Sequence, residues 1–172
     1  MELLIPGLIL VALMVYASTR IKKTAALAFE PETIETDEFV IKKPEGFLNV
    51  IGGDPQYAFE AYSKDFGAAP AEDVRQATVT IKVADAATVD EAVANLTLAG
   101  DVIVSDAGEV VSGLRYRLVE TTETEKGITL RCFHKIAEKN GKLYQLEIKA
   151  LAETGPQFMR TIQAMLASFE LR

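Results

Sequence analysis

The chain's only cysteine and only histidine lie two positions apart, and they are the residues best suited to chemistry. Cys132 and His134 fall in a segment with strand-like alternation, which puts both side chains on one face. A thiol beside an imidazole can act as a nucleophile with its base, and a zinc site could use both if further ligands were near. Instead, Ile128, Leu130 and Ile136 share that face. We therefore expect both residues in a core or at a sheet edge, without a catalytic or metal-binding role.

Two further segments invite a chemical interpretation, but neither has the required spacing. Gly52-Gly53-Asp54 lacks the Lys-Ser/Thr pair and the following helix of a phosphate loop, so it predicts a turn. The segment Phe29–Glu38 holds five carboxylates, but they do not keep the alternate spacing of a calcium-binding loop. The sequence thus predicts an extended acidic linker over residues 29–38, no cofactor or metal, and no enzymatic activity.

A basic stripe is predicted on the outer faces of neighbouring strands, formed by Arg115, Arg117, Arg131 and Lys135. Such a stripe on an acidic domain would be a candidate docking surface for a partner. The alternative, which the sequence favours, is pairing across strands with carboxylates such as Glu120 and Glu147.

The composition is that of one folded acidic domain behind a short apolar segment. The chain has 172 residues, a quarter of them charged, and a formal net charge of −7. An anchor of about 25 residues leaves enough for one domain of ordinary size. The negative charge repels phosphate groups, so we expect no nucleic-acid partner. The single cysteine excludes an intrachain disulfide, which fits a reducing compartment.

The first segment of the chain predicts a membrane anchor over residues 1–28. No charge interrupts Leu3 to Ala17, and with Ser18 and Thr19 the apolar stretch reaches about 17 residues, the lower limit for crossing a bilayer. The lipid bilayer is therefore an expected partner. The apolar side chains of this anchor are Leu3, Leu4, Ile5, Leu8, Ile9, Leu10, Val11, Leu13, Met14, Val15 and Tyr16.

A collar of three cations, Arg20, Lys22 and Lys23, follows the anchor and predicts its orientation. The positive-inside rule places these cations in the cytoplasm and the N-terminus outside. A cleaved signal peptide would carry positive charge before its apolar core, whereas Met1-Glu2 stands there. The prediction is a single-pass protein of the cell (inner) membrane with a cytoplasmic C-terminal domain.

Residues 39–172 predict one α+β domain, in which helices pack on an antiparallel sheet. Thr88 and Glu91 form a capping box that opens a helix ending near Gly100, and a turn is predicted at Asp106-Ala107-Gly108. Asn140-Gly141 is a strong hairpin signal. The expected strands cover residues 39–41, 57–61, 79–83, 114–122, 128–138 and 143–151.

The last predicted element is an amphipathic helix that begins at Thr154-Gly155-Pro156, with Thr154 as the expected cap. Its apolar stripe must dock on the sheet, because the stripe is too continuous to face water. The stripe consists of Phe158, Ile162, Met165, Leu166 and Phe169.

From Pro44 to the end, this layout resembles the PsbP/Mog-type family of small α/β/α sandwich domains. The likeness is carried by Pro44-Glu45-Gly46-Phe47, the strand Lys142–Ala150 and the closing helix Phe158–Phe169 with its final Ala167-Ser168-Phe169, and it covers roughly residues 44–172. Members of the family include extrinsic subunits of photosystem II, bacterial lipoproteins, a nuclear-transport cofactor and effector chaperones. The resemblance therefore implies a binding or assembly role. An added membrane anchor and the predicted side of the membrane differ from the photosystem subunits.

The expected function is that of a non-catalytic accessory subunit that stabilises a multisubunit membrane complex of the photosynthetic or respiratory kind. Its domain would dock on the cytoplasmic face, with integral subunits of the complex as partners. Two alternatives stay open at this point. One is a membrane-tethered chaperone or assembly factor that holds hydrophobic client segments in an exposed apolar groove, for example beside the terminal helix. The other is a small-ligand-binding domain with a deep pocket.

Overall fold

The computed structural model describes residues 13–20, 26–125 and 127–172. Residues 13–20 are helical and precede the domain. The domain's elements are β1 (Glu32–Glu35), β2 (Phe39–Lys43), β3 (Phe47–Asn49), β4 (Tyr57–Ser63), β5 (Ala77–Asp85), α2 (Val89–Leu98), β6 (Val102–Val111), β7 (Leu114–Glu125), β8 (Ile128–Lys139), β9 (Lys142–Leu151), α3 (Pro156–Ser168) and β10 (Glu170–Leu171).

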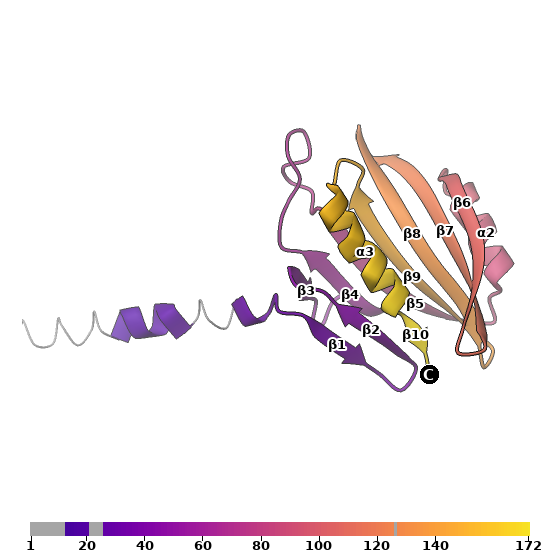
Figure 1. Cartoon of the computed structure of the whole chain (residues 1–172), viewed down its shortest axis with the longest axis horizontal. Helices are drawn as coiled ribbons and strands as arrows, with labels where there is room; N and C mark the ends of the chain where they lie inside the picture. The colour runs from indigo at the N-terminus through magenta and orange to yellow at the C-terminus, as the bar shows by residue number, and fades with distance from the viewer. Residues whose placement is uncertain (1–12, 21–25, 126) are drawn as a thin grey trace, which may run out of the picture.

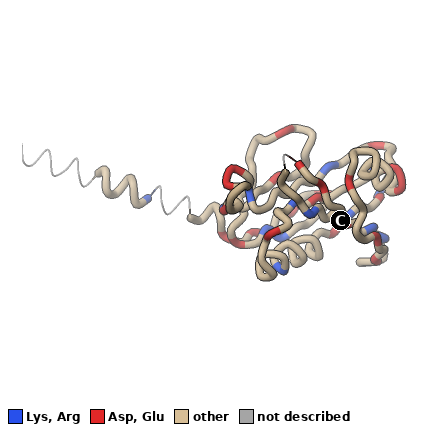
Figure 2. Tube along the Cα trace, turned by 90° about the horizontal axis from the view of Figure 1, so that it is seen from above, with Lys and Arg blue, Asp and Glu red and all other residues tan. Residues whose placement is uncertain are grey.

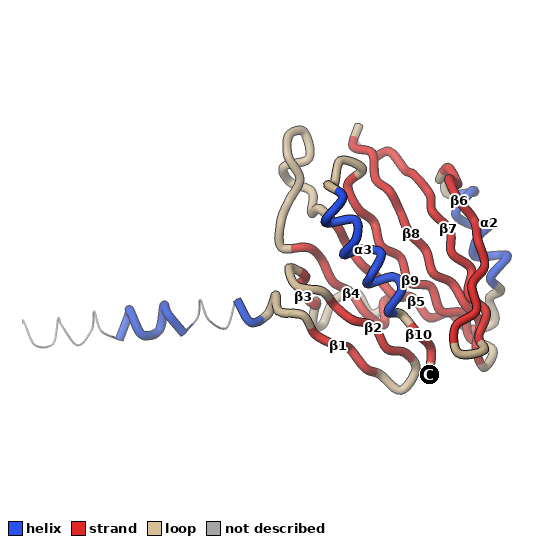
Figure 3. The backbone as a smooth tube through the Cα atoms, viewed as in Figure 1, coloured by secondary structure: helices blue, strands red, loops and turns tan. Residues whose placement is uncertain are grey.

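A seven-stranded sheet forms the centre of the domain, in the order β3-β4-β5-β9-β8-β7-β6 (Figure 3). Its neighbours pair antiparallel, as the tight hairpins predict. The β8–β9 hairpin turns at Asn140-Gly141, where both residues have positive φ, so this predicted hairpin is confirmed. The predicted α+β class with an antiparallel sheet and flanking helices is likewise confirmed.

The helices and a second, small sheet cover the two faces of the large sheet (Figure 1). Helix α3 and the three-stranded sheet β1-β2-β10 lie on one face, which we call the α3 face. Helix α2 lies on the other, the α2 face, where Ala92 packs against Ile136 and Leu143. The capping box of α2 is present as predicted, because Thr88 and Glu91 bond to each other's backbone.

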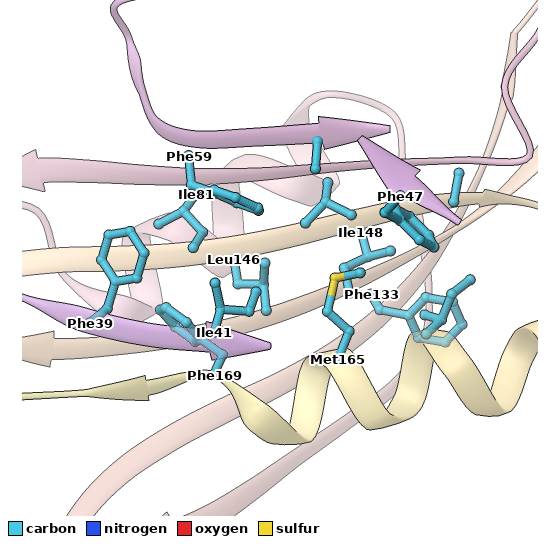
Figure 4. Close-up of a cluster of buried hydrophobic side chains, with 14 of the residues drawn as sticks. Phe39, Ile41, Phe47, Phe59, Ile81, Phe133, Leu146, Ile148, Met165 and Phe169 are labelled. Atoms are coloured by element: carbon cyan, nitrogen blue, oxygen red, sulfur yellow. The ribbon is translucent and has the colours of Figure 1, made fainter. Parts of the chain in front are cut away.

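The main core lies between α3, the small sheet and the α3 face (Figure 4). Ile162 and Met165 are the buried residues of α3, and Phe169 follows directly after the helix. The ring of Phe169 lies 6.0 Å from that of Phe39 and 6.5 Å from that of Tyr116. The apolar stripe predicted for the terminal helix therefore docks on the sheet, and its last residue joins both sheets.

The acidic segment predicted as an extended linker is part of the fold. Glu32–Glu35 forms β1, which pairs antiparallel with β2. The sequence did not show this strand, because two of its four residues are carboxylates and Ile34 is the only apolar side chain in it. Two ion pairs tie the hairpin to the rest of the domain, Arg172 with Glu35 and Lys142 with Glu38.

Lys43 fixes the segment that enters the domain. Its side chain is buried, and its Nζ donates hydrogen bonds to the backbone oxygens of Ala28 (3.0 Å), Glu30 (2.8 Å) and Phe47 (3.0 Å). The amide of Gly46 also donates to the carbonyl of Phe29, at 2.8 Å. A buried cation is stable only when its donors are satisfied. These bonds therefore hold residues 28–30 against the start of β3.

Two predicted local features are wrong. Asp106-Ala107-Gly108 is not a turn but the middle of β6, and the chain reverses instead at Ser112-Gly113. A glycine is compatible with both conformations, so its presence alone did not decide between them. Thr154 does not cap α3: its hydroxyl donates to the carbonyl of Leu151, and Gly155 is the N-cap.

The predicted anchor falls mostly outside the described residues. Leu3, Leu4, Ile5, Leu8, Ile9, Leu10 and Val11, with Lys22 and Lys23 of the collar, lie there, whereas Leu13, Met14, Val15, Tyr16 and Arg20 are described as helix. No helix among the described residues has the length and apolar character needed to cross a membrane.

Replacing Lys43 by methionine tests whether its ammonium group holds the entering segment. The change leaves buried carbonyl oxygens without a donor, so we expect a loss of about 3 kcal/mol in the free energy of unfolding. Urea unfolding of the full chain in mild detergent measures this loss. Hydrogen exchange at the Gly46 amide should also accelerate.

The adjacent exposed Lys42 provides the control. Lys42→Met should change the unfolding free energy by no more than about 0.5 kcal/mol. Equal stability of the two variants would show that the Lys43 contacts are not needed.

Candidate functional site

The four cations predicted as one docking stripe lie on two faces of the sheet. Arg117 belongs to the α2 face, where it pairs with Asp90 of α2 (3.3 Å) and with Asp106 of β6 (2.7 Å from Nη2). Its hydrogen bonds hold the pKa of Asp106 below the usual value. Arg115, two residues before it on β7, is exposed.

Arg131 and Lys135 lie on the α3 face. Arg131 pairs with Glu120 at 2.7 Å and lies over the Phe133 ring. Lys135 is buried, pairs with Glu109 at 2.7 Å and lies 4.6 Å from the centre of the Tyr116 ring. The stripe is therefore not continuous, since the strand pleat separates these two cations from Arg115 and Arg117. Cross-strand pairing, the favoured alternative, is what the structure shows for Arg131 and Glu120.

Cys132 and His134 share the α2 face and are both about 1% exposed, as expected of core positions. Polar side chains from both neighbouring strands surround the imidazole. Thr121 of β7 lies 3.4 Å from Nε2, and Gln145 and Glu147 of β9 lie 3.3 and 3.6 Å from Nδ1. The imidazole thus has polar neighbours at both nitrogens without reaching solvent.

Burial shifts the pKa values of both groups in this cluster. It raises the pKa of the Cys132 thiol to about 12 and lowers the pKa of His134 to about 4. At neutral pH the thiol is therefore protonated and the imidazole neutral, so the pair lacks the thiolate that a nucleophilic cysteine needs. Burial also raises the pKa of Glu147, and within the described residues no group of His, Cys, Asp or Glu is arranged to hold a metal ion.

An open groove of about 540 Å³ lies at the N-terminal end of α3. Its volume falls within the usual range for ligand sites. Phe158 and Thr161 of α3 form one wall, and Leu151 of β9 and the loop residues Ala68 and Ala71 contribute apolar surface. We call this the α3 groove. It is the kind of surface that the chaperone alternative requires beside the terminal helix.

A second apolar surface lies along β6, the outermost strand of the large sheet. Val102, Val104 and Val110 are 57–66% exposed, and Leu98 at the end of α2 is 83% exposed. Isolated exposed apolar residues are common, but several on one strand edge suggest an interaction site. The sequence missed this surface, because a turn was predicted where β6 is continuous.

The fold is similar to those of solved structures that have little sequence identity to this chain. No protein-family model and no curated protein sequence matches the chain. The cyanobacterial PsbP protein CyanoP of Synechocystis sp. PCC 6803 is 12% identical, with a TM-score of 0.57 over 83% of this chain and 92% of that one. LpqN of Mycobacterium tuberculosis, described as involved in cell envelope biogenesis, is 9% identical, with a TM-score of 0.57 over 83% and 90%.

The third is the Ran-binding protein Mog1p of Saccharomyces cerevisiae, 11% identical, with a TM-score of 0.52 over 83% of this chain and 96% of that one. These likenesses show that the domain has a PsbP- and Mog1-like fold, as the sequence resemblance implied. At such low identity they show the fold alone, and the three proteins have different roles.

His134 should make the protein less stable in mild acid. Its pKa is about 4 in the folded chain, against 6.5 for an ordinary histidine, so the unfolded chain binds the proton first as the pH falls. The contribution of His134 to the free energy of unfolding is then fully present well above pH 6.5 and is lost as the pH falls toward 4. The free energy of unfolding should decrease by about 2 kcal/mol between pH 7 and pH 5. Urea unfolding at a series of pH values measures it.

His134→Gln keeps a polar side chain beside Thr121 and Gln145 but removes the titrating group. Because no other histidine exists in the chain, the loss of stability between pH 7 and pH 5 should be about 2 kcal/mol smaller in this variant than in the wild type. The raised pKa of Glu147 acts in the opposite direction and is present in both proteins, so the difference between them isolates His134. Identical slopes would mean that the imidazole is hydrated in the folded protein.

Proposed function

We propose that the chain is a non-catalytic accessory subunit that stabilises a multisubunit membrane protein complex. The observation that carries the proposal is the helix at residues 13–20, whose Leu13, Met14, Val15 and Tyr16 are 60–64% exposed. The domain leaves these four side chains uncovered. An apolar helix is stable when lipid or neighbouring helices cover it.

In this proposal, the small number of residues between this helix and the domain keeps the domain near the membrane. Ala28 is fixed by Lys43, and the distance from Arg20 to Ala28 can be at most about 28 Å. A domain confined so closely binds a neighbouring surface at high effective concentration, even when the contact itself is weak. The proposed docking partners are integral subunits of the same complex, and the positive-inside rule applied to Arg20, Lys22 and Lys23 supports a cytoplasmic location of the domain.

The domain's interior supports a binding role more than a catalytic one. Its buried histidine is neutral and its buried thiol protonated, and the buried lysines bind backbone oxygens or a carboxylate. Figure 2 shows that cations and carboxylates are interspersed over the domain. Among the structures with this fold, Mog1p is a Ran-binding protein and CyanoP a PsbP protein, which agrees with a fold used for association.

Purification of a tagged chain from its native membrane in mild detergent tests the proposal. We expect a stoichiometric set of integral membrane subunits, identified by mass spectrometry. Replacing both Leu13 and Met14 by Asp should move the chain to the soluble fraction and abolish the association, because each charge costs about 3 kcal/mol at the centre of a span.

The conservative double variant, Leu13→Ile with Met14→Leu, should behave as the wild type. Recovery of the wild-type chain alone would contradict the accessory-subunit proposal. Retention of the partners by the soluble Asp variant would assign the association to the domain and contradict the need for an anchor.

The α3 groove favours a second candidate function, that of a membrane-tethered chaperone or assembly factor for hydrophobic segments. The groove combines apolar walls with an opening to solvent, so an apolar client segment could enter it. The same groove could instead hold a small apolar ligand, as the alternative of a small-ligand-binding domain requires. Transient, substoichiometric association with several clients would distinguish this function from that of a stable subunit.

Two substitutions on α3 provide a matched test of the groove. Gln157 lines the groove and is exposed, whereas Gln163 is exposed on the same helix but does not line it. Gln157→Arg should weaken binding of a labelled leucine-rich peptide at least about tenfold, because the charge lies on the apolar site. Fluorescence anisotropy measures the affinity. Gln163→Arg should leave the affinity unchanged, and equal losses in both variants would exclude the groove as the binding site.

A further inference from the structure

The two edges of the large sheet are very different. The edge strand β3 has only three residues, Phe47–Asn49, and short edge strands resist pairing with other chains. The opposite edge strand β6 has ten residues and is exposed over most of its length. In the described part of the chain, no strand pairs with its outer edge. Its outward backbone groups are therefore available to a further strand.

The usual protection of a sheet edge is weak along β6. Charged side chains and bulges normally prevent edge pairing. The two carboxylates of β6 are already paired within the domain, Asp106 with Arg117 and Glu109 with Lys135. A register shift lies between Ile103 and Ser105, but the pairing from Ser105 to Val111 is regular. This regular half of β6 is suited to pairing.

The pattern of side chains on β6 matches a second copy of itself. In such a dimer, the two β6 strands run antiparallel and are related by a two-fold axis perpendicular to the sheet. Residues that lie opposite each other in an antiparallel pair have side chains on the same face, and faces alternate along a strand. The axis must therefore pass beside one residue, which lies opposite its own copy. An axis at Asp106 or Glu109 would bring like charges together, and an axis at Gly108 would place Asp106 opposite Val110. All three arrangements are unfavourable.

An axis at Ala107 avoids these conflicts. It places Ser105 opposite Glu109, without a clash of like charges, and it brings the exposed Val110 close to the exposed Val104, which lies at the register shift. It also places Asp106 opposite Gly108, whose neighbour on β7 is Arg117. Because Gly108 has no side chain, Arg117 of one copy has access to Asp106 of the other. Apolar pairing and charge complementarity thus select the same register.

We propose that β6 is the interface of a two-fold symmetric dimer, in which the β6 strands of two copies pair antiparallel around Ala107. The two large sheets then form one continuous sheet. Strand β6 lies on the opposite side of the domain from β1, so the pairing leaves the N-terminal attachment uncovered (Figure 1).

Cysteine cross-linking of the full chain in mild detergent tests the register. Ala107 faces its own copy across the axis, so Ala107→Cys should form an intermolecular disulfide under mild oxidation. Val102→Cys is the control on the same exposed strand. It lies five residues from the axis, which separates the two cysteines by about 33 Å and prevents a disulfide. The native Cys132 is buried and does not interfere.

A pair of isosteric variants tests the contact without cross-linking. Ala107→Asp places two carboxylates opposite each other and should shift the molar mass of the protein, measured by light scattering with detergent correction, from dimer to monomer. Ala107→Asn has the same shape without charge and should remain dimeric. Circular dichroism should be the same for both, since Ala107 is exposed.

Three results would overturn the proposal. The first is a wild-type protein that is monomeric at all concentrations tested, and the second is a dimer unaffected by Ala107→Asp. The third is equal cross-linking at positions 102 and 107. If the wild type is monomeric and Ala107→Asp loses a partner protein in co-purification, the edge accepts a strand of that partner instead of a second copy.

Discussion

The buried ammonium group of Lys43 is the contact on which the attachment of the N-terminal segment depends. A cation removed from water is costly unless its donors are satisfied, and here three backbone carbonyls satisfy them. Two of those carbonyls belong to residues that precede the first strand, and the third belongs to β3. One side chain therefore connects the entering chain, the small sheet and the edge of the large sheet. Residues 29 and 30, which the sequence predicted as part of a linker, are therefore fixed to the domain in the structure.

The two faces of the large sheet explain the distribution of polar groups. The α3 face is covered by a helix and a small sheet and holds most of the apolar core, so its cations Arg131 and Lys135 must pair internally. The α2 face is covered by only one short helix, and polar side chains replace apolar ones around His134. Among the described residues, no buried side-chain nitrogen or oxygen lacks a hydrogen-bond partner. The polar cluster around His134 is thus hydrogen-bonded within the fold.

Sequence patterns predicted the elements whose signals are local. The alternation of Val79 and Ile81, the capping box at Thr88 and the Asn140-Gly141 turn each depend on neighbouring residues, and each prediction was correct. Features set by distant partners were missed. Strand β1 forms because β2 pairs with it, and half of its own residues are charged. The faces of Arg131 and Arg117 depend on the registers of β7 and β8, and a pattern of alternating cations does not contain that information.

The candidate interaction surfaces also depend on long-range structure. The α3 groove is assembled from a loop near residue 70, the end of β9 and the start of α3, which are far apart in the chain. The free edge of β6 exists because the order of the strands ends there. The fixed N-terminal joint and the free edge lie on opposite sides of one rigid sheet. If the N-terminal helix binds a membrane complex, a second copy paired with β6 therefore lies on the far side of the domain from the joint at Ala28. In the proposed dimer, the two N-terminal joints would therefore lie at the two ends of one continuous sheet.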